Sequence, residues 1–259
     1  SDRPLCQISL CIALSINKQA DTPKALIIRL IFTHLPPLTG QVTFFGGRMA
    51  DFRIDIISDL VCPWCYLGYN RLKQAIDQLG DDYRFDIHWQ PFELHPDIPL
   101  SGVDRDSYLS QKFGSEERLN EATHALQQVG IEAGIQFNFT DKDVLPNSFS
   151  AHRLVSVANK AQLGTQLSLA LFHAYFTEGK NIADIDVLCD IAKHVGLTDE
   201  AIEQAFTENT KLIVEKKMAQ LRSLDIQSVP TYVINDKYLI QGAQTPEAFF
   251  KVLTDINKK

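Results

Sequence analysis

The stretch Asp59-Leu60-Val61-Cys62-Pro63-Trp64-Cys65-Tyr66-Leu67-Gly68 decides the fold class of this 259-residue chain. Residues 52–56, just before it, alternate between apolar and charged side chains, which predicts a half-buried β-strand. After it, apolar residues recur at helical spacing as far as Gly80, a residue type that commonly ends helices. Pro63 suits the first turn of that helix, because its missing N–H would have no partner there. The two cysteines are therefore expected between a strand and the start of a helix.

The segments around this stretch predict the rest of the fold. A second alternating run, residues 83–89, follows the helix after a connection long enough for a right-handed crossover to a parallel strand. Residues 105–224 show helical periods throughout. Two short β-type runs, 231–234 and 238–240, then predict an antiparallel hairpin before a last helix. We expect an α/β, thioredoxin-like fold of the order β-α-β … α-β-β-α, with a large all-helical insertion domain.

The boundaries follow from pattern and charge. Residues 1–48 hold five bases and two acids, a net charge of +3. Because the whole chain has a net charge of −7, residues 49–259 carry a net charge of −10. Residues 1–48 are predicted to be a poorly structured leader or non-native extension, with translation beginning at Met49; a targeting leader and a structural arm are the alternatives. A tryptic peptide running from Leu30 to Arg48 in the endogenous protein would contradict the start at Met49. The predicted thioredoxin-like domain comprises 49–100 and 209–259, and 101–208 is the predicted helical insertion.

Composition excludes several classes of function. The chain has 25 Lys and Arg against 32 Asp and Glu and no basic tract, which argues against nucleic acid as a partner and against stable membrane association. No stretch of about 20 continuous apolar residues suggests a membrane anchor. Five cysteines are an odd number in a large chain, so a fully paired disulfide framework is not expected.

The pair Cys62 and Cys65 can be interpreted as half a zinc site, as a structural disulfide or as a redox dithiol. A zinc site needs further ligands, and the only later cysteine, Cys189, lies in a helical pattern that predicts a buried thiol; no metal is expected. A disulfide closing so short a loop would constrain the unfolded chain little. The N–H groups at a helix start favour a thiolate, and thiolates attack disulfides. The redox interpretation, with Cys62 as nucleophile and Cys65 as resolving thiol, is therefore preferred.

A second motif, Ser228-Val229-Pro230-Thr231, precedes the predicted hairpin. Its plain interpretation is a proline at the entry of a strand, where no ladder hydrogen bond is lost. Together with the CPWC motif and with Gln241-Gly242-Ala243-Gln244, however, it resembles the DsbA-like thioredoxin-fold oxidoreductases. The chain is most similar to the cytoplasmic FrnE-like subgroup of bacteria, whose Asp-x-Val-Cys-Pro-Trp-Cys-Tyr-Leu-Gly signature matches residues 59–68. The resemblance covers essentially residues 49–259.

The resemblance implies a thiol–disulfide oxidoreductase of the protein-disulfide oxidoreductase and isomerase type. It implies that Pro230 is cis beside the dithiol, that the Val229 backbone pairs with the substrate, and that Trp64 lies at the substrate site. No cofactor is implied beyond the redox-active Cys62–Cys65 disulfide, with glutathione as a candidate co-substrate. The implied partners are proteins with thiols or disulfides and low-molecular-weight thiols. The expected compartment is the cytoplasm, or the periplasm if residues 1–48 are a signal.

Two departures from the family shape these expectations. No cysteine pair follows Cys189, so a shuttle through a second dithiol is not expected. Trp64 stands where the strongly oxidising DsbA proteins have histidine, so we expect a reduction potential nearer the thioredoxin and isomerase range. Trp64 and Tyr66 are interpreted either as an apolar platform for substrate or as a cover for the cysteines. Among the histidines, His173 is predicted to lie in the core.

Two other functions compete. The kappa-class glutathione transferases and hydroxychromene-carboxylate isomerases resemble the same fold but replace the first cysteine by serine. The intact Cys62, and Gly242-Ala243-Gln244 after the hairpin, count against that alternative. The other alternative is a non-catalytic chaperone that uses an apolar groove around Trp64. The physiological substrate, the direction of electron flow and the oligomeric state are left open.

Overall fold

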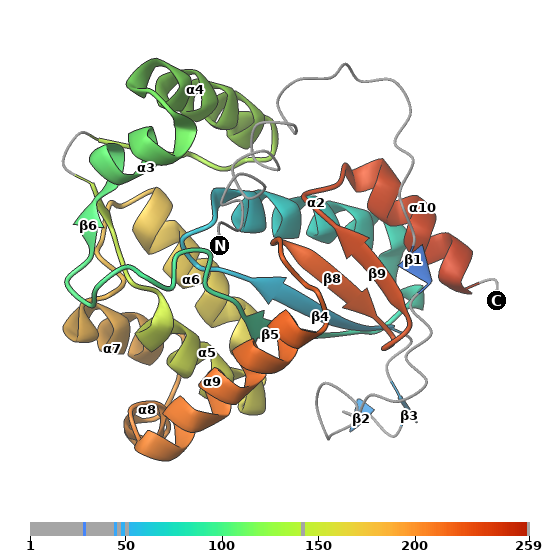
Figure 1. Ribbon diagram of the computed structural model, residues 1–259. Helices are drawn as coiled ribbons and strands as arrows, with labels where there is room; N and C mark the ends of the chain where they lie inside the picture. The colour runs from blue at the N-terminus through green and yellow to red at the C-terminus, as the bar shows by residue number, and fades with distance from the viewer. Residues whose placement is uncertain (1–27, 30–43, 46–47, 50–51, 141–142, 258–259) are drawn as a thin grey trace.

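The computed structural model describes residues 28–29, 44–45, 48–49, 52–140 and 143–257. A five-stranded sheet in the order β1-β9-β8-β4-β5 forms its centre, with helices on both faces (Figure 1). The elements after residue 51 are β4 (Phe52–Ser58), α2 (Pro63–Leu79), η1 (Gly80–Asp82), β5 (Phe85–Pro91), β6 (Val103–Asp104), α3 (Arg105–Phe113), α4 (Glu116–Glu132), β7 (Val144–Leu145), α5 (Phe149–Lys160), α6 (Gly164–Phe176), α7 (Ile185–His194), α8 (Asp199–Ala205), α9 (Glu208–Ser223), β8 (Thr231–Ile234), β9 (Tyr238–Gln241) and α10 (Pro246–Asn257).

The first 48 residues lie mostly outside this description, so the prediction of a poorly structured segment there stays a prediction. Within the described part, β1 (Ile28–Arg29) pairs antiparallel with β9, and β2 (Phe44–Phe45) pairs with β3 (Arg48–Met49). Cys6 and Cys11 lie outside the described residues.

The predicted β-α-β unit is confirmed. Strand β4 runs parallel to β5, in register from Phe52 opposite Phe85 to Ser58 opposite Pro91, and α2 makes the crossover. Gly80 ends α2 with φ 72°, a backbone conformation that glycine adopts without steric cost. The carboxyl end of β4 leads directly into the CPWC motif. The two cysteines therefore lie at the end of the sheet where β4 finishes.

The hairpin brings the second motif, residues 228–231, to the same end of the sheet. Asn235 and Asp236 have φ values of 53° and 52°, which suit the tight turn between β8 and β9. The Asn235 side chain accepts a hydrogen bond of 2.8 Å from the Arg53 backbone N–H, which ties the turn to the start of β4. Strand β8 runs antiparallel to β4 with Thr231 opposite Ile57. Residues 228–231 therefore lie beside the end of β4, where the cysteines begin.

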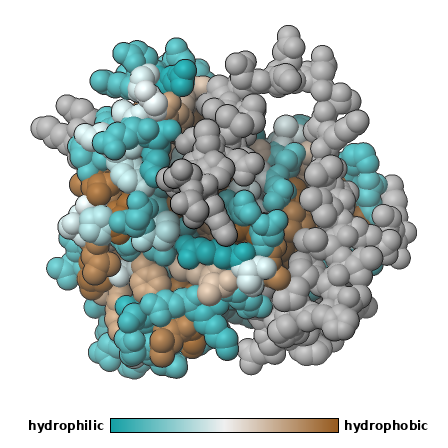
Figure 2. All heavy atoms as spheres, viewed as in Figure 1, coloured by the Kyte–Doolittle hydropathy of each residue, from teal (hydrophilic) through white to brown (hydrophobic). Residues whose placement is uncertain are grey.

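The helices form two layers around the sheet. Helices α2 and α10 pack against each other on one face, while α5, α6 and α9 contact β5 on the side of the helical insertion (Figure 1). Figure 2 shows hydrophobic residues interspersed with hydrophilic ones over the described part of the face in view. Across the described residues, no helix has both the length and the apolar character that a bilayer crossing requires.

Two predictions about single residues are wrong. His173 is not a core residue: its side chain is 53% exposed and lies 3.5 Å from Glu178, because α6 keeps one stripe on the surface despite its apolar sequence. Cys189 is half-buried rather than buried. The buried residues of α7 are Leu188 and Ala192, and Cys189 lies at the margin of this buried face. Partial burial, the first of several causes, raises the pKa of the Cys189 thiol.

Candidate active site: a dithiol at a helix start

The two cysteines of the CPWC motif occupy the first turn of α2. Cys62 is the N-cap residue with extended backbone, Pro63 follows as the first helical residue, and the Cys65 N–H donates to the Cys62 carbonyl at 3.0 Å. Both are free thiols; Cys62 is 3% exposed and Cys65 is fully buried. Cys62 therefore lies at the positive end of the α2 dipole.

The loop from Ser228 to Thr231 lies directly against Cys62. The Val229–Pro230 peptide bond is cis, and the Cys62 Sγ lies 4.0 Å from the Val229 carbonyl oxygen. The Thr231 hydroxyl donates to the Ser228 carbonyl at 2.8 Å, which closes the loop on itself. Two segments 167 residues apart in sequence therefore meet at the sulfur of the first cysteine.

The second cysteine has a different electrostatic environment. Burial and then the hydrogen bond and charge of Cys62 raise the pKa of Cys65 well above its usual value, against smaller lowering effects of the Ser58 hydroxyl and the Asp59 backbone. Cys65 therefore stays a thiol at neutral pH and must lose its proton before it can attack a disulfide. The site thus contains two unequal thiols, one near the helix start and one sealed behind it.

The aromatic neighbours of the dithiol have separate positions. Trp64 is half-buried beside the cysteines. The Tyr66 ring stacks on Phe172 of α6, with ring centroids 5.2 Å apart and an interplanar angle of 10°, and it also makes an edge contact with Phe137 at 6.2 Å. Tyr66 therefore packs α2 against the helical insertion, and Trp64, which is also half-buried, stays the predicted substrate contact.

A buried contact between Asp59 and His152 supports the turn before the cysteines, and it was not predicted from the sequence. Asp59 accepts hydrogen bonds from the backbone N–H groups of Leu94 at 2.7 Å and Val61 at 3.3 Å, and its Oδ1 lies 3.5 Å from Nε2 of His152. Both side chains are almost fully buried, at 1% and 3% exposure. The signal for His152 was its place on the apolar face of α5, three residues before Val155, where a polar group needs a partner.

Burial by itself raises the pKa of Asp59, but other contacts outweigh it. The hydrogen bond and charge of His152, the Leu94 N–H and the Ser148 hydroxyl together hold the pKa of Asp59 below its usual value. Asp59 is therefore ionised at neutral pH, and its own carbonyl accepts from the Cys62 N–H at 3.0 Å. The same residue fixes the turn with its side chain and the start of the CPWC motif with its backbone.

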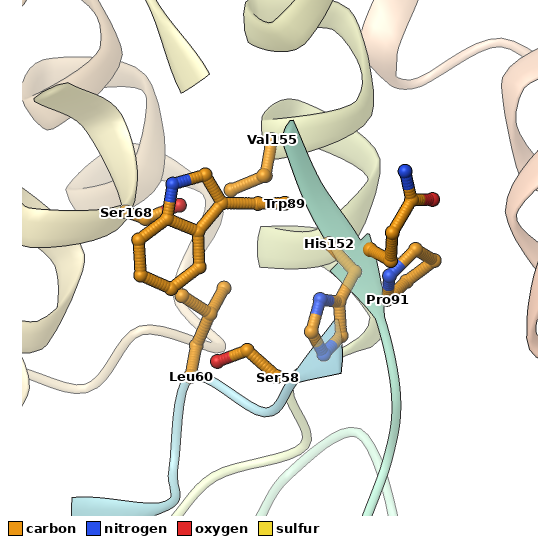
Figure 3. A pocket seen from close by; sticks show the side chains of 8 residues that line it. Ser58, Leu60, Trp89, Pro91, His152, Val155 and Ser168 are labelled. Carbon is orange, nitrogen blue, oxygen red and sulfur yellow. The ribbon is translucent and has the colours of Figure 1, made fainter. Parts of the chain in front are cut away.

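A small cavity lies behind the motif, between β4, β5 and the helices α5 and α6 (Figure 3). Its walls include Ser58, Leu60, Trp89, His152 and Ser168, and it has room for about 10 Å³, the space of one water molecule. Nowhere in the part of the chain that the structure describes do three or more His, Cys, Asp or Glu residues form a group that could hold a metal ion.

Comparison with known proteins places this site in a family. The sequence profile of the DSBA-like thioredoxin domain matches residues 53–254. The chain belongs to this family. The matched region contains the CPWC motif, the helical insertion and the Val229–Pro230 loop, and so covers nearly all of the described fold.

Individual proteins are also similar to this chain in sequence or in structure. An uncharacterised protein of Bacillus subtilis (strain 168), YwbO, is 29% identical over 208 residues, which cover 80% of this chain and 98% of that protein. A probable DsbA oxidoreductase of Streptomyces coelicolor has a similar structure, with a TM-score of 0.70 and 24% identity over 79% of this chain and 89% of its own. The cytosolic disulfide reductase DsbM of Pseudomonas aeruginosa, solved with glutathione, has a TM-score of 0.56 and 17% identity over 80% of this chain and all of its own. These structures share the fold with this DsbA-like chain.

Proposed function

We propose that this DsbA-like protein catalyses thiol–disulfide exchange through Cys62 and Cys65. The observation that carries the proposal is the position of Cys62, at the start of α2 and 4.0 Å from the Val229 carbonyl beside the cis bond to Pro230. A substrate that lies along the Val229 backbone presents its sulfur to Cys62. The half-buried Trp64 adds an apolar contact next to the same point.

In the reducing direction the reaction has two steps. The Cys62 thiolate attacks one sulfur of a substrate disulfide, so that a Cys62–substrate disulfide forms and the other substrate sulfur leaves as a thiolate. Cys65 then loses its proton and attacks the Cys62 sulfur, which forms the Cys62–Cys65 disulfide and releases the second substrate thiolate. The substrate gains two electrons and the dithiol loses two. The oxidising direction is the reverse.

We propose that proteins with thiols or disulfides and low-molecular-weight thiols are the substrates, with glutathione as the electron partner that returns the dithiol to its starting state. The protein needs no other cofactor for this cycle, because the dithiol itself carries the electrons. The high pKa of Cys65 divides the roles: the first cysteine reacts with substrates, and the second acts only after a mixed disulfide is in place.

The test is to trap the mixed disulfide. Cys65→Ser removes the resolving thiol. This variant is therefore expected to accumulate covalent adducts when it is mixed with glutathione disulfide or with native insulin, whose disulfides are intact. Mass spectrometry of the intact protein measures the adduct, and peptide mapping assigns it to Cys62. The double variant Cys62→Ser, Cys65→Ser is the control and should trap nothing at the motif. A Cys65→Ser variant that forms no adduct at Cys62 would overturn the proposal, whatever forms at the three other cysteines of the chain.

A further inference from the structure

The hydroxyl of Tyr232 is a buried polar group that the exchange reaction, as described, does not use. Tyr232 lies on β8, two residues after Pro230, and its side chain is fully buried. Within the described part of the chain its hydroxyl has no hydrogen-bond partner. An unpaired buried hydroxyl costs about 1–3 kcal/mol of stability, which phenylalanine at the same position would avoid. Such a donor points to an acceptor that exists only in one state of the reaction.

The hydroxyl lies one helical turn from the second cysteine. A Cβ on Gly68 would be 2.3 Å from the Tyr232 oxygen, and Gly68 follows Cys65 by three residues on the buried side of α2. Side chains three residues apart on a helix have Cβ atoms about 5–6 Å from each other. The Tyr232 oxygen is therefore within about 8 Å of the Cys65 Cβ, in the protein interior, where a charge still acts strongly over this distance.

The negative charges that act most on the hydroxyl are those of the dithiol. Burial is the largest cause that raises the pKa of Tyr232 well above its usual value, and the charges of Cys65 and then of Cys62 follow. The opposing effect comes from Arg71, whose guanidinium donates to the Ala243 carbonyl at 2.8 Å. The hydroxyl therefore has the dithiol and a cation as its charged neighbours.

The phenol can turn its hydrogen without moving its ring. The Tyr232 ring packs edge-on against Phe249 of α10, with centroids 4.9 Å apart, and β8 pairs with β4 on one side and with β9 on the other. What remains free is rotation about the bond from the ring to the oxygen. Arg71 carries donors alone, so it cannot accept the phenol hydrogen and its positive charge repels it. A thiolate of the dithiol is the acceptor that this arrangement favours.

We propose that the Tyr232 hydroxyl directs its hydrogen to the Cys65 sulfur and stabilises the thiolate with which Cys65 attacks the Cys62–substrate disulfide. The inference rests on the proposed exchange reaction. The Cys65 thiolate gives an electron pair to the Cys62 sulfur as the bond from Cys62 to the substrate breaks, and the substrate sulfur leaves as a thiolate. The proton that Cys65 has lost to solvent is matched by one that the substrate thiolate takes up. Tyr232 keeps its own proton throughout, and in the reverse direction it stabilises Cys65 as the leaving group.

The effect on rate combines two opposing consequences of a lower thiol pKa. The pKa of Cys65 is well above its usual value, chiefly because of burial, so only a small fraction of it is thiolate at neutral pH. For such a thiol, each unit by which a donor lowers the pKa gives about tenfold more thiolate and makes that thiolate about threefold less nucleophilic. The net gain is about threefold at neutral pH, and it disappears once the pH exceeds the pKa of the thiol.

The other groups that act on this part of the site are the same with and without the Tyr232 hydroxyl. The polar and charged groups that act on Cys65, or on the Arg71 side of the phenol, are Ser58, Asp59, Cys62, Arg71, Glu132 and Glu247. Tyr232→Phe changes none of them and keeps the ring that packs on Phe249. A comparison of this variant with the wild type therefore isolates the donor.

The experiment follows the two steps in one trace. Reduced protein is mixed rapidly with excess 5,5′-dithiobis(2-nitrobenzoate) across neutral and alkaline pH, in a background that carries Cys6→Ser, Cys11→Ser and Cys189→Ser. The first coloured thiolate reports attack by Cys62. The second, released at a rate independent of reagent concentration, reports attack by Cys65 on the mixed disulfide.

Tyr232→Phe is expected to slow the second phase about threefold or more at neutral pH and to leave the first phase unchanged. The pH at which the second phase reaches its plateau should rise, and above it the variant should be as fast as the wild type or faster. Tyr238→Phe, which removes the hydroxyl of a largely buried tyrosine at the turn end of the same hairpin, should alter neither phase.

Two results would overturn the inference. One is a second phase in Tyr232→Phe with the rate and pH profile of the wild type. The other is a second phase slowed by the same factor at every pH, which a change in packing would produce and the loss of a donor to the thiolate would not. A wild-type trace without a second phase would instead overturn the proposed function, because Cys65 would then not resolve the mixed disulfide.

Discussion

Asp59→Ala is expected to lower the free energy of unfolding by about 3–5 kcal/mol, because it leaves buried N–H donors without an acceptor, at about 1–3 kcal/mol each. The carboxylate accepts from the N–H groups of Val61 and Leu94 and lies 3.5 Å from His152, all in the interior. Its removal leaves two buried N–H donors without their acceptor, whereas the His152 ring keeps the Phe92 carbonyl at 3.1 Å. Urea unfolding at neutral pH measures the loss, and Asp81→Ala, which removes an exposed acid after α2, is the control.

The same contacts predict how this loss depends on pH. The pKa of Asp59 is lower in the folded chain than its ordinary value, which is about 3.9 in an unfolded chain. The ionised form is therefore favoured by folding, and its contribution is fully present above the unfolded value and disappears as pH falls through the folded pKa. The difference in stability between the wild type and Asp59→Asn should be constant near neutral pH and should shrink in acid. A difference that does not change with pH, or one that matches Asp81→Asn, would contradict this account.

Much of the fold could be predicted from the sequence because it depends on local pattern. The alternation in residues 52–56 and 83–89 predicted the strands on either side of the motif, and the parallel pairing of β4 with β5 confirms it. The turn at Asn235 and Asp236 was recognisable because both residue types tolerate the positive φ that a tight hairpin turn requires. The family follows from the motif in this context rather than from its two cysteines alone.

The parts that could not be predicted depend on contacts between distant segments. The partner of Asp59 is His152, which follows 93 positions later on a helix whose packing against β5 has no local signature. His173 was misjudged because helical period in an apolar segment does not say which side neighbouring helices leave uncovered. Gly68 ends the signature stretch that decided the fold, yet no local pattern explains why that position is glycine. The structure supplies the reason.

Gly68 lies on the buried side of α2, three residues after Cys65, where β8 and the loop after β9 approach the helix. A Cβ at this position would be 2.3 Å from the Tyr232 hydroxyl, 3.1 Å from Cγ of Pro230 and 3.3 Å from Cα of Ala243. The Tyr232 side chain is fully buried, so its hydroxyl has little room to move. The absence of a side chain at Gly68 therefore lets the cis-proline loop lie close to the helix that carries the cysteines.

Gly68→Ala is expected to lower the free energy of unfolding by about 1–3 kcal/mol through overpacking. The sign is informative, because in an unconstrained helix interior the same change stabilises by about 1 kcal/mol. The substitution should also slow mixed-disulfide formation at Cys62, since Pro230 is one of the groups that must shift. Urea unfolding measures the first effect, and the rate at which Cys62 forms a mixed disulfide with glutathione disulfide in the Cys65→Ser background measures the second.

Tyr232→Phe provides the matched background that identifies the cause. The Tyr232 hydroxyl has no hydrogen-bond partner in the described protein, so its removal alone should be neutral or slightly stabilising. In the double variant the 2.3 Å contact no longer exists, so the loss of unfolding free energy caused by Gly68→Ala should fall by more than half. The 3.1 Å contact with Pro230 remains and accounts for the rest of the loss. Gly68→Ala with the stability of the wild type, or an equal loss in both backgrounds, would show that the close approach of Tyr232 is not what requires glycine here. If the double variant regains stability but Cys62 still reacts slowly, the kinetic effect comes from Pro230. This residue contacts the Gly68 position and follows Val229, whose carbonyl lies 4.0 Å from the Cys62 sulfur.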